Sequence, residues 1–308
     1  MTVRPSGEQH ELAADGYTAV VTEVGAALRV LAHDGRDLVL PWSAEEMMPG
    51  HRGALLAPWP NRVVDGRYRD PDGREQLLAL SEPKRGHAIH GLVDWAPWWL
   101  VAHTEDSVVL GARVFPRSGY PYVLDVTVAY ALGPDGLSTT VRATNVGAGR
   151  APYGCGAHPY VLAGPARPGA VDDWTLALPA TRVLEVTEDR LVPTGLAEVD
   201  GTGYDFRSPR RIGDTFLDHA FTGVLRDDTG RATVRVTGDD GSGVEVRFGS
   251  ECPWVQVHTA DKPGAASHRA GLAVEPMTCP PDAYNSGTDL VVLEPGQTHQ
   301  ASWTIAAV

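Results

Sequence analysis

Hydrophobic and polar residues alternate along several stretches of the chain. In residues 125–132 the sequence DVTVAYAL places Val, Val, Tyr and Leu at every second position. Because successive side chains of a β-strand point to opposite faces, this alternation predicts a strand with one buried face. Residues 233–237 and 244–248 alternate in the same way and flank a glycine-rich turn, which predicts a β-hairpin. Further strands are predicted at residues 17–22, 98–103, 107–114, 137–145, 174–178, 254–258 and 290–293.

Helical patterns are nearly absent from the chain. Few windows of a dozen residues lack Gly or Pro, and almost none has apolar residues at positions i, i+3, i+4 and i+7. We therefore expect only short helical turns, near Glu45 or Pro281. No segment has the composition of an interdomain linker, and no repeat of about 20–50 residues is visible. The pattern predicts an all-β fold in which residues 1–308 form one domain of two packed antiparallel sheets.

The composition agrees with this prediction. A length of 308 residues allows either one large β-domain or two domains of about 150 residues, and it suffices to bury a substantial core. The 34 Gly and 24 Pro residues favour many turns over long helices. A hydrophobic content of 43% excludes a disordered chain.

The charge and the apolar runs exclude two classes of partner. The formal net charge of −13 repels phosphate backbones and anionic bilayers, so nucleic acid and membrane surfaces are poor partners. No apolar run approaches the roughly 18 residues of a membrane span, and residues 1–12 lack the apolar core of a secretory signal. The three cysteines have no CxxC spacing, which favours neither a disulfide framework nor a zinc site. We expect a cytoplasmic protein.

Four segments interrupt the alternation with residues suited to chemistry. In the first, residues 57–68 (APWPNRVVDGRY), two prolines and a tryptophan restrict the backbone just before Asn61 and Arg62. An arginine in such a turn can donate hydrogen bonds to an oxygen-rich ligand, or it can form an ordinary surface ion pair.

The second segment, residues 86–99 (GHAIHGLVDWAPWW), contains two histidines and three tryptophans. The spacing of His87 and His90 could serve a metal ion, but no nearby carboxylate completes a site. A histidine is also the side chain best suited to proton transfer near neutral pH. The tryptophans, Trp95 among them, either pack in the core or stack on the apolar face of a sugar.

The third and fourth segments each offer one strong candidate. In residues 154–161 (GCGAHPYV), His158 precedes a proline, which favours an extended backbone that can direct the imidazole into a cleft. A histidine satisfied within the fold is the alternative. In residues 271–285, Glu275 is predicted to end the strand-like run 272–274 and to be fixed by the proline that follows it. Since a charge is costly to bury, this placement favours a function.

Two weaker candidates accompany them. Asp218 lies in the apolar segment LDHAF, and Gln256 shares a strand face with His258 in WVQVHT. The chain has no G-x-S-x-G, G-x-x-x-x-G-K-[ST] or strand-linked G-x-G-x-x-G motif, which argues against esterase, NTPase and dinucleotide-binding functions.

Taken in order, these segments resemble those of the aldose 1-epimerase (mutarotase) family. The resemblance implies a large antiparallel β-supersandwich and an enzyme that interconverts the α and β anomers of a free aldose. It implies no metal and no organic cofactor, and we expect a monomer or a homodimer. The segments that carry it are NRVVDGRY from Asn61, HAIHG from His87, GAHPY from Gly156, LDHAF from Leu217, the WVQVHT strand and AVEP from Ala273.

The resemblance also implies a role for each candidate residue. Opening a cyclic hemiacetal needs one group that protonates the ring oxygen and another that removes the proton of the anomeric hydroxyl. His158 would be the general acid at the ring oxygen, Glu275 the general base at the C1 hydroxyl, and His90 would assist near the ring oxygen.

The substrate-binding residues implied in the same way surround this pair. Arg62 would donate hydrogen bonds to ring hydroxyls and Asp218 would accept them. The full predicted set is Asn61, Arg62, Trp95, Asp218 and Gln256.

There are alternatives to an epimerase of a neutral aldose, which differ either in the substrate or in the activity. The segments APWPNR and HGLVDWAPWW look closer to a bacterial branch of the family that includes a protein proposed to act on a sulfonated glucose derivative. A hexose-6-phosphate 1-epimerase would need basic residues, for which Arg62, Lys84 and Arg85 lie near the right segments. The chain could instead bind a sugar without catalysis. It could also be a glycosidase whose two carboxylates, Asp218 and Glu275, stand about 5–5.5 or 6.5–9.5 Å apart.

Overall fold

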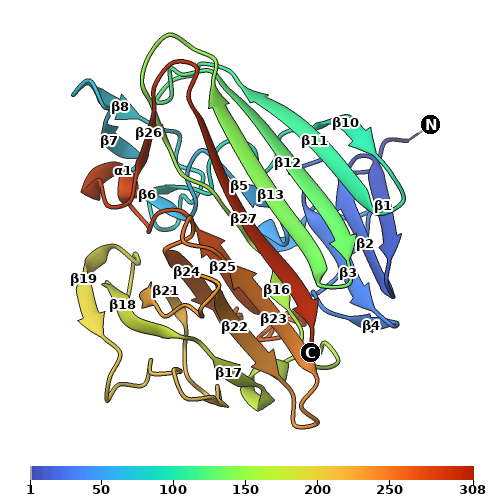
Figure 1. The fold of residues 1–308 in the computed structure, drawn as a ribbon. Helices are drawn as coiled ribbons and strands as arrows, with labels where there is room; N and C mark the ends of the chain where they lie inside the picture. Colours follow the sequence, from blue (N-terminus) through green and yellow to red (C-terminus); the bar gives the residue numbers. More distant parts are fainter. Residues whose placement is uncertain (1) are drawn as a thin grey trace.

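Nine antiparallel strands form the larger of two main sheets in the computed structural model, which describes residues 2–308 (Figure 1). Their order across the sheet is β10-β11-β12-β13-β27-β23-β22-β17-β20. In β12 every second side chain, including Val126, Val128 and Tyr130, is buried, which is the pattern that the alternation predicts. The strands span Trp99–His103 (β10), Ser107–Val114 (β11), Leu124–Gly133 (β12), Gly136–Asn145 (β13), Thr175–Ala177 (β17), Arg210–Arg211 (β20), Ala232–Thr237 (β22), Gly243–Phe248 (β23) and Thr298–Ala307 (β27).

The second main sheet has eight strands. Its order is β19-β18-β21-β24-β25-β15-β5, and β16 also pairs with β25. The strands span Leu55–Leu56 (β5), Gly156–Ala157 (β15), Tyr160–Val161 (β16), Ala180–Val186 (β18), Pro193–Glu198 (β19), Asp218–Val224 (β21), Trp254–His258 (β24) and Leu272–Met277 (β25).

Smaller elements surround the two main sheets. A four-stranded sheet is built from Gln9–Ala14 (β1), Tyr17–Thr22 (β2), Leu28–His33 (β3) and Arg36–Asp37 (β4). Three two-stranded ribbons pair Arg62–Val64 (β6) with His87–Ile89 (β9), Arg67–Arg69 (β7) with Glu75–Leu77 (β8), and Ala151–Tyr153 (β14) with Val291–Leu293 (β26). The helices are the 3₁₀ turns Pro49–His51 (η1) and Ala170–Asp173 (η2) and the α-helix Ala283–Ser286 (α1). Within residues 2–308 none of them has the length and apolar character needed to cross a bilayer.

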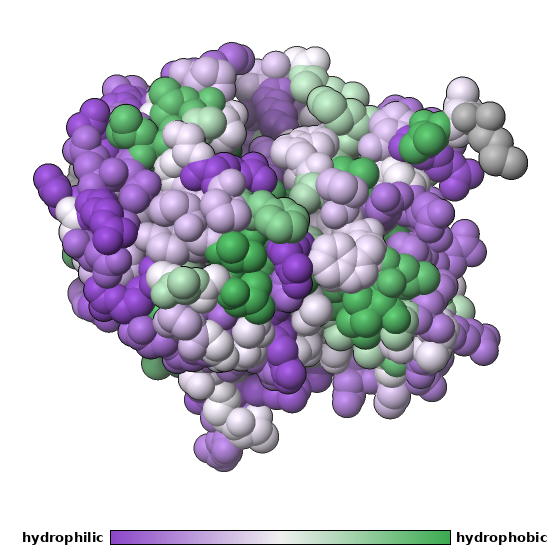
Figure 2. Space-filling model, turned by 90° about the horizontal axis from the view of Figure 1, so that it is seen from above, coloured by the Kyte–Doolittle hydropathy of each residue, from purple (hydrophilic) through white to green (hydrophobic). Residues whose placement is uncertain are grey.

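Side chains from both main sheets meet in one hydrophobic cluster. It contains Val126 and Val128 from β12 together with Val257 from β24 and Val274 from β25. In Figure 1, β5 and β16 of the eight-stranded sheet lie behind β13 and β27 of the nine-stranded sheet. The sheets are thus the layers of a large antiparallel β-sandwich with the core between them, as predicted. Polar residues cover most of the surface seen from above (Figure 2).

Each strand that the alternation predicts overlaps an observed strand. Residues 233–237 and 244–248 form the hairpin β22–β23, and a short helix follows Pro281, whereas Glu45 lies in a turn that precedes η1. Many observed strands, including β1, β3, β18, β21 and β27, have no counterpart in the prediction. The prediction that the strand ends at Glu275 is wrong, because β25 continues through Pro276 to Met277. A proline is tolerated there because the neighbouring chain is interrupted between β15 and β16, so no ladder hydrogen bond is lost.

Candidate active site

One face of the eight-stranded sheet carries four polar side chains side by side. The register pairs Asp218 on β21 with His258 on β24, and Gln256 on β24 with Glu275 on β25. Directly paired residues of antiparallel strands point to the same face, and so do residues two apart along a strand. All four side chains therefore lie on one face, while the alternate residues, such as Val257, enter the core.

Two segments outside these strands add histidines to this face. His158 follows β15; its backbone N–H donates to the carbonyl of Ala54 at 3.1 Å, and its own carbonyl accepts from the N–H of Gly53 at 2.8 Å. His90 follows β9 in a left-handed conformation with φ 64°, and its N–H donates to the carbonyl of Asn61 at 2.8 Å. Backbone hydrogen bonds therefore fix the position of both rings.

The imidazole of His158 contacts the carboxyl group of Glu275. Nε2 of His158 lies 3.4 Å from Oε1 of Glu275, and the two side chains are only 7% and 2% exposed. The His158 ring stacks on Tyr160 at 4.9 Å and meets the edge of His90 at 5.2 Å between ring centroids. The structure thus brings together the three residues that the sequence nominated as catalytic, in surroundings that exclude most water.

Burial changes the proton affinity of the Glu275 carboxyl group. Burial raises the pKa of Glu275 well above its ordinary value, and the negative charge of Asp218 raises it further, whereas Arg62 acts in the opposite direction. A strand inside a sheet thus presents a carboxyl group with a raised pKa, and a raised pKa makes its carboxylate form a stronger base.

Burial acts on the histidines in the opposite direction. Burial lowers the pKa of His158 well below its ordinary value, and the nearby His51 and His258 lower it further. His90 behaves in the same way, with burial again the main cause. At pH values between the lowered pKa of His158 and the raised pKa of Glu275, the two groups together hold one proton.

Asp218 remains a carboxylate. Burial acts to raise its pKa, but the nearby His258 and Arg62 and a hydrogen bond from Gln256 outweigh burial and lower the pKa. Nε2 of Gln256 donates to Oδ1 of Asp218 at 2.8 Å, and Nδ1 of His258 lies 3.8 Å from the same oxygen. Asp218 is therefore suited to accept hydrogen bonds rather than to transfer a proton.

Arg62 is held by a buried ion pair. Its Nε and Nη2 atoms donate to the two carboxylate oxygens of Glu82 at 2.7 and 3.0 Å, and Arg85 donates to Glu82 as well at 3.0 Å. Oδ1 of Asn61 accepts from the backbone N–H of Arg62 at 2.9 Å. Asn61 and Glu82 thus orient the guanidinium, and its Nη1 atom keeps only a long 3.4 Å contact with Asn61.

His87 does not join the cluster. Its Nε2 atom lies 2.9 Å from the carbonyl oxygen of Arg190, and its Nδ1 atom accepts from the N–H of Asp65 at 3.3 Å. Within the described part of the chain, His, Cys, Asp and Glu form no group of three or more that could hold a metal ion. The H-x-x-H spacing therefore has a structural origin.

The three tryptophans of the second segment have different environments. Trp98 is buried, and its indole N–H donates to the carbonyl of Val93 at 3.2 Å. Trp99 is exposed on the edge strand β10. Trp95 is 43% exposed, and its ring lies 5.8 Å from that of His51, which in turn lies 4.6 Å from His90. Of these three tryptophans, Trp95 is the one with a ring contact to a histidine beside the cluster.

Sequence reasoning missed one loop that reaches the cluster. This loop carries His51, which packs on His90, and Arg52, whose guanidinium lies 5.6 Å from the ring centroid of Tyr160. Neither residue belongs to the segments that carried the resemblance, so no signal in the sequence identified them.

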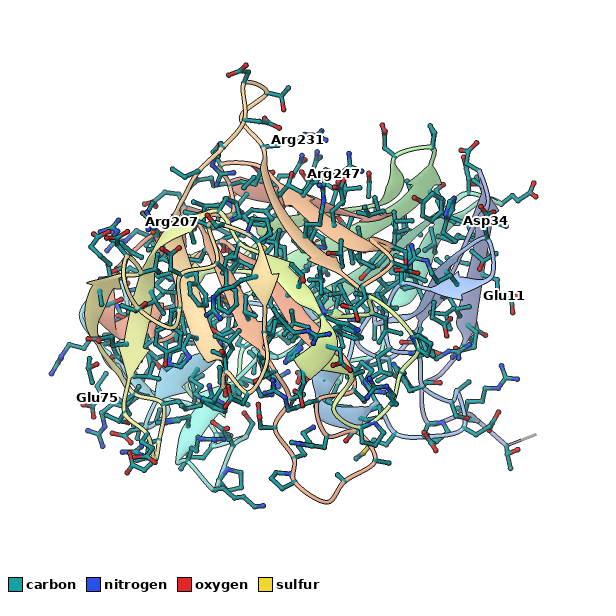
Figure 3. All side chains as sticks on the ribbon, turned by 90° about the horizontal axis from the view of Figure 1, so that it is seen from below. Glu11, Asp34, Glu75, Arg207, Arg231 and Arg247 are labelled. Carbon is teal, nitrogen blue, oxygen red and sulfur yellow. The ribbon has the colours of Figure 1, made fainter. Side chains whose placement is uncertain are left out.

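Four buried polar atoms of the cluster have no hydrogen-bond partner among residues 2–308. They are Nδ1 of His90, Nδ1 of His158, Oε1 of Gln256 and Oε2 of Glu275. Buried polar groups are usually paired, because an unpaired one costs about 1–3 kcal/mol. Their gathering on one sheet face indicates a site that binds a ligand rich in hydroxyl groups. The charged side chains labelled in Figure 3, in contrast, lie around the outside of the fold.

Comparisons with known proteins agree with this geometry. The sequence profile described as Aldose 1-epimerase matches residues 8–306. The uncharacterized protein YihR of Escherichia coli K12 is 39% identical over 301 residues, which cover 97% of this chain and 93% of YihR. Human galactose mutarotase is 32% identical over 212 residues, which cover 64% of this chain and 58% of that protein. The crystal structure of a GalM/aldose epimerase homologue from C. elegans has the same fold, with a TM-score of 0.83 at 21% identity and coverage of 98% and 99%. The chain belongs to the aldose 1-epimerase family.

Proposed function

We propose that the protein is an isomerase, an aldose 1-epimerase that interconverts the α and β anomers of a free hexose. The observation that carries this proposal is the buried pair of His158 and Glu275, whose Nε2 and Oε1 atoms lie 3.4 Å apart on a sheet face with unpaired polar atoms. An imidazole and a carboxyl group in contact provide the one acid and one base that ring opening requires.

The proposed reaction uses the single proton that the pair holds. In the reactive form this proton resides on His158, and Glu275 is a carboxylate. Glu275 takes the proton from the C1 hydroxyl, the bond between C1 and the ring oxygen breaks as the C1 carbonyl forms, and His158 protonates the ring oxygen. The open aldehyde rotates about C1–C2. The hydroxyl formed from the ring oxygen then attacks the other face of the carbonyl. Glu275 returns its proton to the C1 oxygen, and His158 takes back the proton of the attacking hydroxyl.

The neighbouring side chains hold the sugar in this scheme. His90 meets the edge of His158 and assists near the ring oxygen, while Asp218 accepts hydrogen bonds from ring hydroxyls. Arg62 donates through the guanidinium that Glu82 orients, and Gln256 offers the unpaired Oε1 atom. Trp95, exposed beside the cluster, presents a ring on which the sugar can stack.

A reducing compartment suits this enzyme. Cys155, Cys252 and Cys279 are all free and buried. Since unpaired thiols persist best where glutathione keeps them reduced, we propose that the protein works in the cytoplasm.

Polarimetry tests the proposed activity. Freshly dissolved α-D-glucose and α-D-galactose should reach anomeric equilibrium faster with the protein than in buffer alone. Glu275→Gln should lose about 10²–10⁴-fold of the acceleration, because an amide cannot accept the proton. Glu185→Gln, which changes an exposed carboxylate on β18 of the same sheet, is the matched control and should retain the wild-type rate. Sugar binding in a calorimeter without any acceleration would instead favour a sugar-binding protein.

A second candidate substrate is a hexose with an anionic group at C6. Arg52 and Lys262 lie near the cluster, and neither forms an ion pair with a carboxylate among residues 2–308. Nζ of Lys262 lies 3.2 Å from the position that a Cβ would take on Gly50, in the loop that carries Arg52. Partial burial lowers the pKa of Lys262, and the positive charge of Arg52 lowers it further. Two unpaired cations in a chain of net charge −13 favour an anion such as a sulfonate or phosphate.

Neutral and anionic hexoses are distinguished as substrates by comparing their KM values. If the substrate is anionic, glucose 6-phosphate or a 6-sulfonated glucose is epimerised with a lower KM than glucose, and Lys262→Ala removes the difference. Lys84→Ala, which changes the only other lysine of the chain, is the control and should preserve it. Equal KM values for neutral and anionic sugars would leave the free hexose as the substrate.

A further inference from the structure

The loop of residues 49–54 is fastened directly to the backbone of His158. Gly53 donates to the carbonyl of His158 at 2.8 Å, and Ala54 accepts from its N–H at 3.1 Å. Within the loop, His51 adopts a left-handed conformation with φ 56°, which a side chain other than Gly adopts only when its surroundings enforce it. The position of His51 relative to His158 is therefore set by the fold.

The His51 side chain lies between two groups of the proposed sugar site. Its ring meets His90 at 4.6 Å and Trp95 at 5.8 Å between centroids, both edge to face. The side chain is 25% exposed, whereas His90 and His158 are nearly fully buried. His51 is therefore the histidine of this group that lies closest to solvent, next to the exposed Trp95.

Asp94 holds one nitrogen of the His51 ring. Nδ1 of His51 lies 3.0 Å from Oδ2 of Asp94, although its N–H bond is not aligned with that oxygen. The Asp94 side chain is 8% exposed. Its backbone is also fixed, because its carbonyl oxygen packs so closely on Gly25 that a Cβ there would approach it to 2.3 Å. A buried carboxylate on a rigid backbone thus faces a partly exposed imidazole.

The contact between Asp94 and Nδ1 of His51 determines whether Nε2 donates or accepts a hydrogen bond. A carboxylate at Nδ1 favours the tautomer that carries its proton there, so that Nε2 of the neutral ring has a lone pair. The four unpaired atoms of the cluster are all buried, whereas the His51 ring is partly exposed and packs against Trp95, so its second nitrogen is available to a ligand.

We infer that His51, oriented by Asp94, is a specificity-determining residue that accepts a hydrogen bond from a hydroxyl of the bound sugar through Nε2. The inference rests on the proposed epimerase function and adds a residue pair to its substrate-binding set. His51 takes no part in the proton transfers between the sugar, His158 and Glu275. Its loss should therefore weaken binding and leave the chemical step intact.

Steady-state kinetics of four single variants and one double variant test this role, with the hexose that the wild type epimerises fastest. His51→Asn keeps an amide near the position of Nδ1 and lacks Nε2, so KM should rise about 10-fold, as for His51→Ala, with kcat within about threefold of wild type. His51→Gln places an amide near the position of Nε2 and should restore KM to within about threefold. Asp94→Ala should also raise KM, but should add nothing in a chain that already carries His51→Ala.

A matched control separates this effect from a loss of stability. His33 is 30% exposed and lies 3.9 Å from Asp34, but its ring stacks on Tyr17 on the four-stranded sheet. His33→Ala should leave KM and kcat unchanged. The inference is overturned if His51→Asn keeps the wild-type KM, if kcat falls while KM stays constant, or if the effects of Asp94→Ala and His51→Ala on KM simply add.

The same variants distinguish failure of this inference from failure of the proposed function. If the wild type does not accelerate mutarotation, the proposed function fails, and the dissociation constants for the same hexoses are then measured by calorimetry. A higher Kd for His51→Asn than for His51→Gln would still support a hydrogen bond between Nε2 of His51 and the sugar. Equal Kd values would refute it. If the wild type is active and His51→Asn retains the wild-type KM, only the inference fails.

Discussion

Removing one partner of the buried ion pair of Arg62 and Glu82 should destabilise the fold far more than the same change in an exposed ion pair. The two side chains are 8% and 16% exposed and form two parallel hydrogen bonds. Arg113 and Asp125 form the same bidentate contact at the surface, where the side chains are 44% and 33% exposed. The substitutions Glu82→Gln and Asp125→Asn therefore each remove one carboxylate charge from a bidentate contact with an arginine, in two different surroundings; Glu82 also accepts a hydrogen bond from Arg85.

The burial of the ion pair sets the expected loss of unfolding free energy. Removing one partner of a buried ion pair costs about 3–5 kcal/mol, because the other charge remains without compensation. An unfolding entropy of about 2.1 cal/mol/K per residue amounts to roughly 650 cal/mol/K for a chain of this length. The melting temperature of Glu82→Gln should therefore fall by about 5–8 °C. Asp125→Asn should melt close to the wild type, because surface ion pairs contribute little.

Differential scanning calorimetry measures both changes, and polarimetry on the same samples gives the functional effect. We expect Glu82→Gln also to raise KM, because Arg62 loses the carboxylate that orients its guanidinium. Equal melting temperatures for Glu82→Gln and Asp125→Asn would refute the reasoning, since the burial difference would then have no energetic consequence. A double variant that lacks both Arg62 and Glu82 should be more stable than the variant that lacks Glu82 alone.

Two further predictions concern the site. The rate should follow a bell-shaped pH profile, because the His158–Glu275 pair gains a second proton as pH falls through the lowered pKa of His158 and loses its proton as pH rises through the raised pKa of Glu275. Asp218→Asn removes a charge that raises the pKa of Glu275, so the alkaline limb should move to lower pH; an unmoved limb would contradict this assignment. Trp95→Ala should raise KM with little change in melting temperature, whereas Trp98→Ala should cost about 3–5 kcal/mol of stability; comparable melting temperatures would contradict the assignment of Trp98 to the core.

Alternation located the strands whose two faces differ strongly in polarity. In β12 the contrast between valine and polar residues is clear, and the prediction is confirmed. In β27, THQASWTIAA, Ala301, Trp303 and Ile305 alternate with polar residues, but residues 298–300 are all polar, so the alternation covers only half of the strand. That strand forms because its neighbours β13 and β23 pair with it, which is information that local sequence does not contain.

Residues of the candidate site could be predicted where their polarity differed from that of the surrounding segment. Glu275 is a carboxylate in an apolar strand, and the structure brings it to His158. His87 has the same residue type as His90 three positions later, yet the left-handed turn at His90 sends the two rings to different partners. His51 and Asp94 are far apart in sequence, and only the packing of the loop 49–54 joins them.

The alternation along β25 makes the candidate site depend on the folding of one strand. Val274 packs in the core, and its neighbour Glu275 points to the opposite face. Since a slip of one residue moves every side chain of a strand to the other face, a misregistered β25 would place the carboxyl group in the hydrophobic layer and the valine beside the sugar. Under the proposed function, a molecule refolded from denaturant can be active only with the native register, so a regained rate of mutarotation would count the molecules that have assembled this sheet correctly.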